Sequence, residues 1–517
     1  MTLIFKEDGD MELRKNVSVK RIIGMLACVA AGLMLIRAPV VADTPEFKES
    51  LAPFPPAVAG WTAFGTSIKF SADMTHMAYV ASRDKKFTVV RDGKIGPLFD
   101  AIGQDTPIFS PDGKHIVYKA KKGDKWCLVI DNKEQARQYE AVSVPLFSPD
   151  SAHMLYAGKK GEKQCLVVDD REVGCYDSIL QNGIRFSHNS ARWAAVVIKK
   201  KQQVVVVDGQ EGAAYEKVNL LLFSHDDRRL AYAASRSEKW MMVVDGKEGA
   251  SWKAISVYVF SPDSQHLYYT FQKDNKWRMM IDDKEGAAVS DGFGMPAFSL
   301  DGKHMSQVVI RNKKWFMILD GREDTAAWDE IAVVSYSPDS KRVAYNTLKE
   351  KQWFMVVDGQ AKKAYDAVAL AFFSSDSRHV AFTAQRGGKW FIVMDGREEA
   401  AYNTVSMPLF SPDGKHVSYL AQKEGIWLVV TDGKEGPAYA EVANLSWSPD
   451  SRHLVYMAER SGFWLVCVDG RPAQNVFQGF IEGSSLQFIT PDRLRTLAVK
   501  TGKAGPEFIT YEIEIRK

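Results

Sequence analysis

A short element of the form aromatic-Ser-x-Asp, or a recognisable variant of it, occurs twelve times between Phe70 and Asp492. Successive copies lie 37 to 41 residues apart. A period of this length is the signature of a repeat architecture, in which each copy forms one small unit that packs against its neighbours. The copies begin at Phe70, Phe109, Phe147, Phe186, Phe223, Phe260, Phe298, Tyr336, Phe373, Phe410, Trp447 and Phe488.

Each copy predicts four short strands, as the unit that begins at Phe410 illustrates. Residues 411–414 read Ser-Pro-Asp-Gly, which is the chemistry of a tight turn. Residues 415–421 alternate in polarity, and residues 427–431 run into Asp432-Gly433, a strong hairpin signal. A more polar fourth strand is expected over 434–442. Four short strands per repeat are typical of one blade of a β-propeller, whereas a helical repeat would need two amphipathic stretches that the unit lacks.

The turn at 410–414 and the strand that follows it resemble those of the TolB-like, WD-repeat-like β-propellers of bacteria. The resemblance covers about residues 60 to 517 and concerns the fold. It implies an exported protein that binds other macromolecules, although propellers host unrelated activities. The chain departs from TolB itself, which pairs one six-bladed propeller with a separate α/β domain, because this sequence shows no α/β segment and its repeats number twelve.

Twelve copies leave two arrangements open, which are two six-bladed rings in tandem or one large ring. Propellers typically have four to eight blades, which favours two rings. The repeat lapses between Asp283 and Gln307: Val289 replaces the aromatic of the fourth strand, Leu300 replaces Pro, and Gln307 replaces the Tyr of the second strand. We therefore predict an all-β chain with a first propeller at 60–290 and a second at 291–517.

The last copy predicts how the array closes, because it ends without a fourth strand. Gly60-Trp61 resembles that missing strand. We therefore expect the N-terminal segment, over residues 60–69, to pair with the last blade. Residues 43–59 are then a linker.

The first 42 residues have the layout of a secretory signal peptide. Four basic residues between Arg14 and Arg21 precede an apolar run at 22–36, and Val40-Val41-Ala42 offers a cleavage site. The apolar run is shorter than the roughly 20 residues that cross a bilayer. This favours export over an uncleaved anchor, which remains the alternative. A lipoprotein site at Cys28 is disfavoured by the apolar stretch that follows it.

Cleavage after residue 42 would lower the formal charge from +3 to about +1. A nearly neutral protein gives no general electrostatic argument for binding nucleic acid. We expect a periplasmic or secreted monomer with no stable membrane span. Cys165 and Cys175 flank the predicted turn Asp169-Asp170, so a disulfide between them is one hypothesis, and two buried thiols are the other.

Histidine and tryptophan, which would attract a catalytic or binding interpretation, follow the repeat. Eight histidines lie six residues after the repeat aromatic, where other copies have Arg192, Arg229 and Arg342, and the remaining two, His188 and His225, take the Pro position of the turn. All thirteen tryptophans also occupy repeat positions, and packing between blades explains them better than carbohydrate stacking. The eight histidines are His76, His115, His153, His266, His304, His379, His416 and His453.

No motif for catalysis or for metal or nucleotide binding is present: G-x-S-x-G, H-E-x-x-H, C-x-x-C, a P-loop and an EF-hand loop are all missing. We therefore predict no catalytic residue, no cofactor and no metal ligand, and assign no individual binding residue. The leading hypothesis is a non-enzymatic scaffold that binds a protein or cell-envelope component through loops on the channel face. The alternative is a propeller-type enzyme or sensor in which carboxylates at the channel mouth act on a sugar or peptide.

Overall fold

The computed structural model describes residues 47–516 except 54–57, 65–66, 482–484 and 503–504, together with two short strands near the start of the chain. These two strands, β1 (Ile4–Phe5) and β2 (Met11–Glu12), pair with each other. The predicted signal peptide at 1–42 lies otherwise outside the described residues. Within the described part, no helix has the length and apolar character needed to cross a bilayer.

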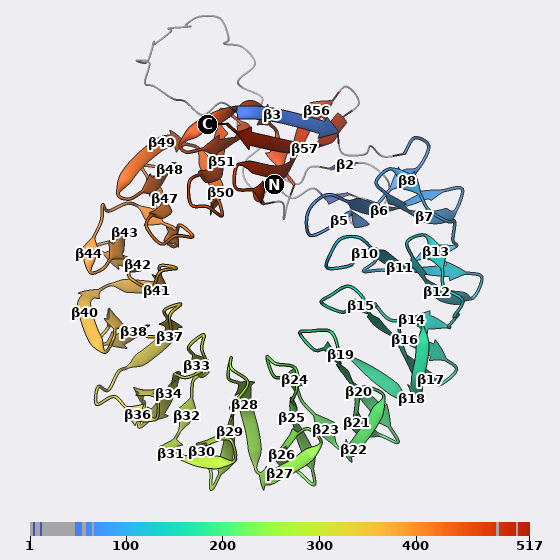
Figure 1. Ribbon diagram of the computed structural model, residues 1–517, viewed down its shortest axis with the longest axis horizontal. Helices are drawn as coiled ribbons and strands as arrows, with labels where there is room; N and C mark the ends of the chain where they lie inside the picture. Colours follow the sequence, from blue (N-terminus) through green and yellow to red (C-terminus); the bar gives the residue numbers. More distant parts are fainter. Residues whose placement is uncertain are drawn as a thin grey trace, which may run out of the picture.

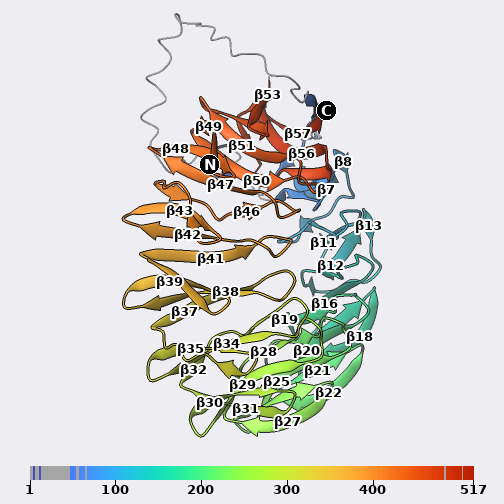
Figure 2. The same cartoon turned by 60° about the vertical axis from the view of Figure 1, so that its left-hand side comes forward.

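The described chain from β3 (Phe47–Pro53) onward forms twelve small antiparallel sheets arranged in one ring (Figure 1). Each sheet is a blade of four strands, which in eleven blades follow the sequence order from the inside of the ring outwards, and in seven blades the first strand is split in two. Figure 2, turned by 60°, shows the blades stacked side by side along the wall of this ring. The all-β propeller class predicted from the repeat is therefore confirmed.

The strands fall into four sets by their place in the blade. The first, innermost strands are β4 (Thr62–Ala63) with β5 (Lys69–Phe70), β9 (Ala101–Ile102) with β10 (Ile108–Phe109), β14 (Ala141–Val142) with β15 (Leu146–Phe147), β19 (Ser178–Phe186), β23 (Lys217–Val218) with β24 (Leu222–Phe223), β28 (Ala254–Phe260), β32 (Gly292–Phe293) with β33 (Ala297–Phe298), β37 (Glu330–Tyr336), β41 (Ala367–Phe373), β45 (Thr404–Val405) with β46 (Leu409–Phe410), β50 (Glu441–Trp447), and β54 (Gly479–Phe480) with β55 (Gln487–Thr490). The second strands are β6 (Met77–Arg83), β11 (Ile116–Lys122), β16 (Met154–Lys160), β20 (Trp193–Lys199), β25 (Leu230–Arg236), β29 (Leu267–Lys273), β34 (Met305–Arg311), β38 (Val343–Lys349), β42 (Val380–Arg386), β47 (Val417–Lys423), β51 (Leu454–Arg460) and β56 (Arg493–Gly502).

The third strands are β7 (Lys86–Arg91), β12 (Lys125–Ile130), β17 (Lys163–Val168), β21 (Gln202–Val207), β26 (Lys239–Val244), β30 (Lys276–Ile281), β35 (Lys314–Leu319), β39 (Gln352–Val357), β43 (Lys389–Met394), β48 (Ile426–Thr431), β52 (Phe463–Val468) and β57 (Gly505–Ile515). The fourth, outermost strands are β8 (Lys94–Ile95), β13 (Lys133–Glu134), β18 (Arg171–Tyr176), β22 (Gln210–Tyr215), β27 (Lys247–Trp252), β31 (Lys284–Ser290), β36 (Arg322–Glu323), β40 (Gln360–Tyr365), β44 (Arg397–Glu398), β49 (Lys434–Tyr439), β53 (Arg471–Phe477) and, for the twelfth blade, β3 (Phe47–Pro53).

The hairpin between the third and fourth strands forms as its sequence predicts. Asp92 and Gly93 both have positive φ, of 49° and 74°, as a two-residue type I′ turn requires. Where Gly is replaced, Asn132 and Asp170 take the same conformation with φ of 63° and 59°. These are the residues that tolerate positive φ best after Gly, so each blade keeps the same turn.

The predicted division into two six-bladed propellers, at 60–290 and 291–517, is not found; the ring is single. The expected boundary between the sixth and seventh blades is an ordinary contact between neighbours. Tyr268 and Met279 of the sixth blade pack on Val309 and Ile318 of the seventh, and all four side chains are buried. The repeat fixes the number of blades, but the small angle between adjacent sheets decides how many blades close a ring, and no local motif encodes that angle.

The ring closes through an N-terminal strand, as predicted, but the strand is β3 and not residues 60–69. β3 pairs with β57 along its whole length, from Phe47 opposite Ile515 to Pro53 opposite Ile509. β4, inside the predicted segment, instead pairs with β6 of the first blade. The twelfth blade has a long edge at β57 whose hydrogen-bonding groups need a partner, and the seven residues of β3 match it better than the two of β4.

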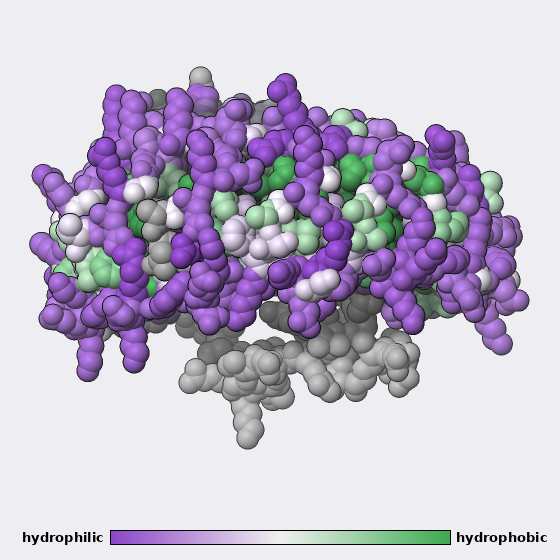
Figure 3. Space-filling model, turned by 90° about the horizontal axis from the view of Figure 1, so that it is seen from below, coloured by the Kyte–Doolittle hydropathy of each residue, from purple (hydrophilic) through white to green (hydrophobic). Residues whose placement is uncertain are grey.

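The core of the ring lies between the blades. The middle residues of the second and third strands of a blade are buried, and their side chains form apolar clusters with those of the next blade. Leu497 of the twelfth blade packs on Met77 and Tyr79 of the first, so the circle is complete. Seen from outside, hydrophilic side chains cover both rims of the wall, and paler, more apolar residues lie between them (Figure 3).

Candidate functional site

The eight histidines of the repeated row each lie against the hairpin aspartate of their own blade. In the copy at Phe410, His416 Nδ1 is 2.7 Å from Asp432 Oδ2, and Asp432 Oδ1 accepts the main-chain N–H of Val417 at 3.0 Å. The imidazole also stacks on Trp447 of the next blade, with ring centroids 5.6 Å apart. The other seven pairs are His76–Asp92, His115–Asp131, His153–Asp169, His266–Asp282, His304–Asp320, His379–Asp395 and His453–Asp469.

Arginine performs the same task where it replaces histidine. Arg192 Nε donates to Asp208 at 3.0 Å, and its guanidinium lies 5.4 Å from the ring centroid of Phe223 in the next blade. Arg342 makes the corresponding contacts with Asp358 and Phe373. The position therefore needs an N–H donor for the turn and a flat group for the neighbouring aromatic, which both residue types supply.

The repeated Ser and Asp of the motif are hydrogen-bonded within the turn and across blades. Ser110 Oγ donates to Asp112 at 2.6 Å and accepts the main-chain N–H of His115 at 3.0 Å. The main-chain N–H of Asp112 then donates to Ser151 of the next blade at 3.0 Å. Both hydrogen bonds of the buried Ser110 hydroxyl are made within the turn, so the repeated serine has a structural role.

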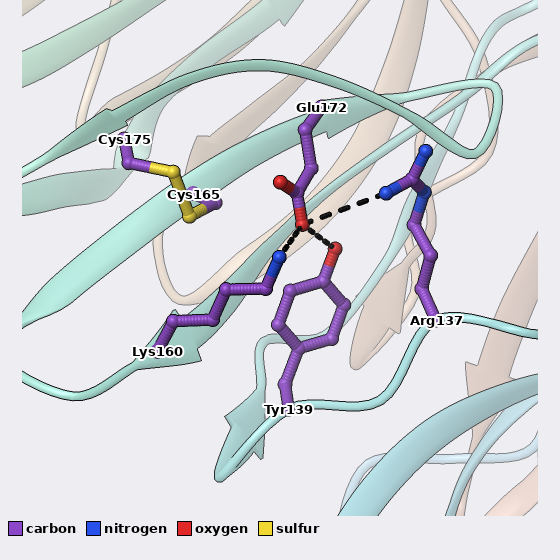
Figure 4. The surroundings of a disulfide bond; sticks show 6 residues. All are labelled: Arg137, Tyr139, Lys160, Cys165, Glu172 and Cys175. Carbon is purple, nitrogen blue, oxygen red and sulfur yellow. Dashed lines mark hydrogen bonds and ion pairs between the residues drawn. A yellow bond between two sulfur atoms is a disulfide. The ribbon is translucent and has the colours of Figure 1, made fainter.

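Glutamates on the fourth strands connect neighbouring blades near the outer wall, as Figure 4 shows for the second and third blades. Tyr139 Oη donates to Glu172 at 2.9 Å, Lys160 contacts the same carboxylate, and Arg137 lies 3.6 Å from it. The hydrogen bond from Lys160 holds the pKa of Glu172 below its usual value, and burial raises the pKa of Tyr139. Tyr215–Glu248, Tyr365–Glu398 and Tyr402–Glu435 repeat the tyrosine contact.

Cys165 and Cys175 form a disulfide between the paired strands β17 and β18 (Figure 4). The hypothesis drawn from their spacing is confirmed. Glu172 lies close enough to both sulfur atoms to suggest a metal-binding group. Because the sulfurs are bonded to each other, neither is a thiolate that could bind a metal. Cys127 and Cys467 are buried free thiols.

His188 and His225, at the Pro position of two successive turns, form the one histidine pair outside the row among the described residues. Their rings stack with centroids 5.7 Å apart and planes within 9°. His188 Nδ1 lies 2.9 Å from the buried Asp227, which also accepts the main-chain N–H groups of His188 and Asn189. Asp227 replaces the Ser that bridges blades elsewhere, so this pair is a local variant of the same junction.

Shallow grooves separate neighbouring blades. One of about 310 Å³ lies between the second and third blades and is lined by His115, Phe147 and His153. Another, of about 530 Å³, lies beside the first strands of the first and second blades and includes Lys69, Gln104 and Asp105. The histidines in the first groove already contact aspartates, whereas Lys69, Gln104 and Asp105 in the second are exposed.

The first strands of the blades lie on the inside of the ring (Figure 1). In several blades the pairing with the second strand shifts register near the middle of the first, for example between Ile255 and Tyr258 and between Ile331 and Val334. The residue at this irregularity is exposed in several blades, as Val333 and Met407 show. Sequence reasoning did not single these residues out, although they recur three residues before the repeat aromatic.

No family model matches the chain, and no curated protein matches it in sequence. Solved structures that are similar to it are β-propellers, among them a TolB protein, in agreement with the resemblance carried by the repeat. TolB from Acinetobacter baumannii is 14% identical, with 49% of this chain and 77% of TolB covered and a TM-score of 0.22.

The propeller domain of the Trilobed protease from Pyrococcus furiosus is 13% identical, with 50% of this chain and 96% of that domain covered and a TM-score of 0.26. The Dos1 propeller is 12% identical, with 65% and 92% covered and a TM-score of 0.29. These values give no argument about function, and the twelve-bladed ring rests on the strand pairing of the chain itself.

Proposed function

We propose that the chain is a non-enzymatic, exported propeller that binds a protein or cell-envelope component through the inner surface of its ring. The observation that carries the proposal is that the repeated polar residues and the exposed first-strand residues have different roles. The repeated His, Arg, Ser and Asp residues hold turns and blades together, whereas the exposed residues of the first strands have no such task in the described part of the chain.

The size of the ring supports a macromolecular partner. Sheets that pack face to face lie about 10 Å apart, so twelve blades need a mean circumference of about 120 Å and a mean radius of about 19 Å. That radius is twice that of a six-bladed ring with the same spacing. A ring of this size offers an extended concave surface, and repeat proteins use such surfaces to bind other macromolecules.

The disulfide supports export, because such bonds persist in oxidising compartments such as the periplasm and the extracellular space. The proposal includes a monomeric protein that needs no cofactor and binds no nucleic acid. Affinity capture from an envelope fraction with the full ring tests it, and the expected result is one partner that survives washing at high salt. Failure to retain any specific partner contradicts the proposal.

A second candidate function is recognition of a sugar or peptide in the groove beside Lys69, Gln104 and Asp105. The observation that favours it is the exposed carboxylate of Asp105, held by a backbone with φ of 61°. Hydrolysis of a glycoside would normally need a second carboxylate, and the residues that line this groove include no other. Binding from a glycan and peptide array that Asp105→Asn abolishes would favour this candidate.

A further inference from the structure

Seven blades carry an aliphatic or methionine side chain three residues before the repeat aromatic. Four of these side chains are exposed, with Leu220 at 53%, Met295 at 69%, Val333 at 51% and Met407 at 56% of full exposure. The other three are half-buried. We call the set the apolar arc, and it consists of Val144, Leu220, Val257, Met295, Val333, Leu370 and Met407, from the third blade and from the fifth to the tenth.

The backbone explains why these side chains are exposed. Val333 donates its main-chain N–H to Asn346 Oδ1 of the second strand at 3.0 Å, and Val257 donates to Thr270 Oγ1 at 3.2 Å. A side chain thus replaces the main-chain carbonyl of a regular ladder, and the first strand bows away from its sheet, as β-bulges do. Since this strand is the innermost of each blade, the arc follows the inside of the ring (Figure 1).

The five-residue first-strand segments that carry the apolar arc contain no charged residue. In the third blade and in the fifth to the eleventh, none of the five residues before the repeat aromatic is Asp, Glu, Lys or Arg, although 25% of the chain is charged. Lys69, Asp105 and Arg185 lie at comparable places in the first, second and fourth blades. A charged partner held against the arc would lose hydration and find no counter-charge, whereas an apolar one would not.

We propose that the apolar arc binds an uncharged apolar segment of a partner protein, such as the apolar face of a helix. This inference rests on the proposed function and names the chemistry of the partner. Single apolar side chains recur once per blade through six successive blades, from the fifth to the tenth, with small polar residues such as Ser256 between them. Two methionines give the surface side chains that adapt to an irregular partner.

The test uses the full chain and two fluorescent probe peptides. One is an 18-residue helix with a leucine stripe and Gln and Ser elsewhere, and the other has lysine in place of each leucine. The arc variant is L220K/M295K/M407K. The matched control L98K/I426K/F463K changes three apolar residues of similar exposure that lie away from the first strands.

Anisotropy titrations are expected to show that the leucine-stripe peptide binds the wild type and the control, and binds the arc variant at least tenfold more weakly. The lysine-stripe peptide is expected not to bind the wild type. If the triple variant unfolds at a lower temperature than the wild type, the milder variant M295S/M407S is measured in its place. It should also bind the leucine-stripe peptide more weakly than the wild type does. The inference is overturned if the leucine-stripe peptide does not bind, or binds wild type and arc variant equally.

Two further outcomes would assign the arc to another occupant and overturn the inference. One is displacement of the peptide by phosphatidylethanolamine–phosphatidylglycerol vesicles, and the other is self-association of the wild type that the arc variant lacks. Envelope capture separates this inference from the proposed function. If the arc variant and the wild type capture the same partner, the inference about the arc is wrong and the proposed function stands. If the wild type captures no partner, the proposed function is wrong.

Discussion

At the scale of single residues, the position six after the repeat aromatic shows what a repeat position demands. His416 and Arg342 differ in shape and charge, yet each contacts the hairpin aspartate of its own blade and lies over an aromatic ring of the next. The spacing in the sequence was enough to predict a structural role for the row. The contact with the next blade was not predictable, because it depends on how two blades face each other.

His416→Arg is therefore expected to change the local stability by no more than about 0.5 kcal/mol, because both contacts can be kept. His416→Ala removes both and should lower it by about 1–2 kcal/mol. Native-state hydrogen exchange of β47 and β48 measures the difference. Equal losses for Arg and Ala would show that the position needs histidine itself.

The turn aspartates predict a loss of stability in acid. The hydrogen bond from Ser411 lowers the pKa of Asp413 to about 2, and that from Ser448 lowers the pKa of Asp450 to about 2. In the unfolded chain an aspartate titrates near 3.9. Because the folded pKa is the lower one, the stabilisation is complete above about pH 4 and is lost as the pH falls towards 2.

Thermal midpoints measured between pH 5 and pH 2 should therefore fall mainly below pH 4. The double variant D413N/D450N, which cannot ionise at either site, should show a shallower fall in this window. A midpoint that stays constant down to pH 2 would contradict the assigned hydrogen bonds.

At the scale of elements, the contacts between blades explain the lapse in the repeat. In six junctions of the described ring the aromatic of one fourth strand meets the Tyr or Phe of the next second strand edge-on, as Tyr402 meets Tyr419 with centroids 6.3 Å apart. Ser290, which pairs with Trp277, and Gln307 occupy these two positions at the junction of the sixth and seventh blades, and both are buried. Both halves of one aromatic pair are replaced together, which is a local repacking and not a domain boundary.

The disulfide between Cys165 and Cys175 links the neighbouring strands β17 and β18 covalently. It closes a loop with a sequence separation of 10, for which loop entropy predicts about 2–3 kcal/mol of stabilisation. C165S/C175S should lower the thermal midpoint of the oxidised protein, and reductant should have no further effect on that variant. An equal midpoint for variant and wild type would show that the bond does not form in solution.

The closing strand β3 is expected to depend on Glu49. Its carboxylate accepts hydrogen bonds from the main-chain N–H groups of Gln474 and Asn475 in the eleventh blade and from Tyr511 in the twelfth. The side-chain amide of Asn475 also donates to it, so Glu49→Ala should lower the stability of β3 by at least about 2 kcal/mol, because four donors lose a charged acceptor. Exchange of the β57 amides measures this, and Lys48→Ala, on the same strand and largely exposed, is the matched control.

At the scale of the whole molecule, the ring is a single closed structure whose blades are held mainly by their two neighbours. Each half of the chain would expose one face of the sixth–seventh junction and one face of the closing junction. Tyr268 and Met279 on one side and Val309 on the other are buried only because the two halves meet. Neither half forms a closed ring.

Chains 43–290 and 291–517, expressed apart, are therefore expected not to fold into stable monomers, whereas co-expression should give a complex with the mass of the whole. Size-exclusion chromatography and near-ultraviolet circular dichroism measure both. Two stable, separately folded halves would restore the two-propeller interpretation. Electron micrographs of the intact chain should show one ring of twelve blades.

The sequence by itself determined the blade. Its turns need Pro, Gly or Asp at fixed places, its strands alternate, and its histidines recur in register, and all of these are local constraints that a short segment carries alone. The tertiary structure decided the number of rings, the strand that closes them and the apolar arc. These depend on the small angle between neighbouring sheets and on pairing between residues more than 450 positions apart, as Glu49 and Tyr511 are. No single repeat contains either quantity.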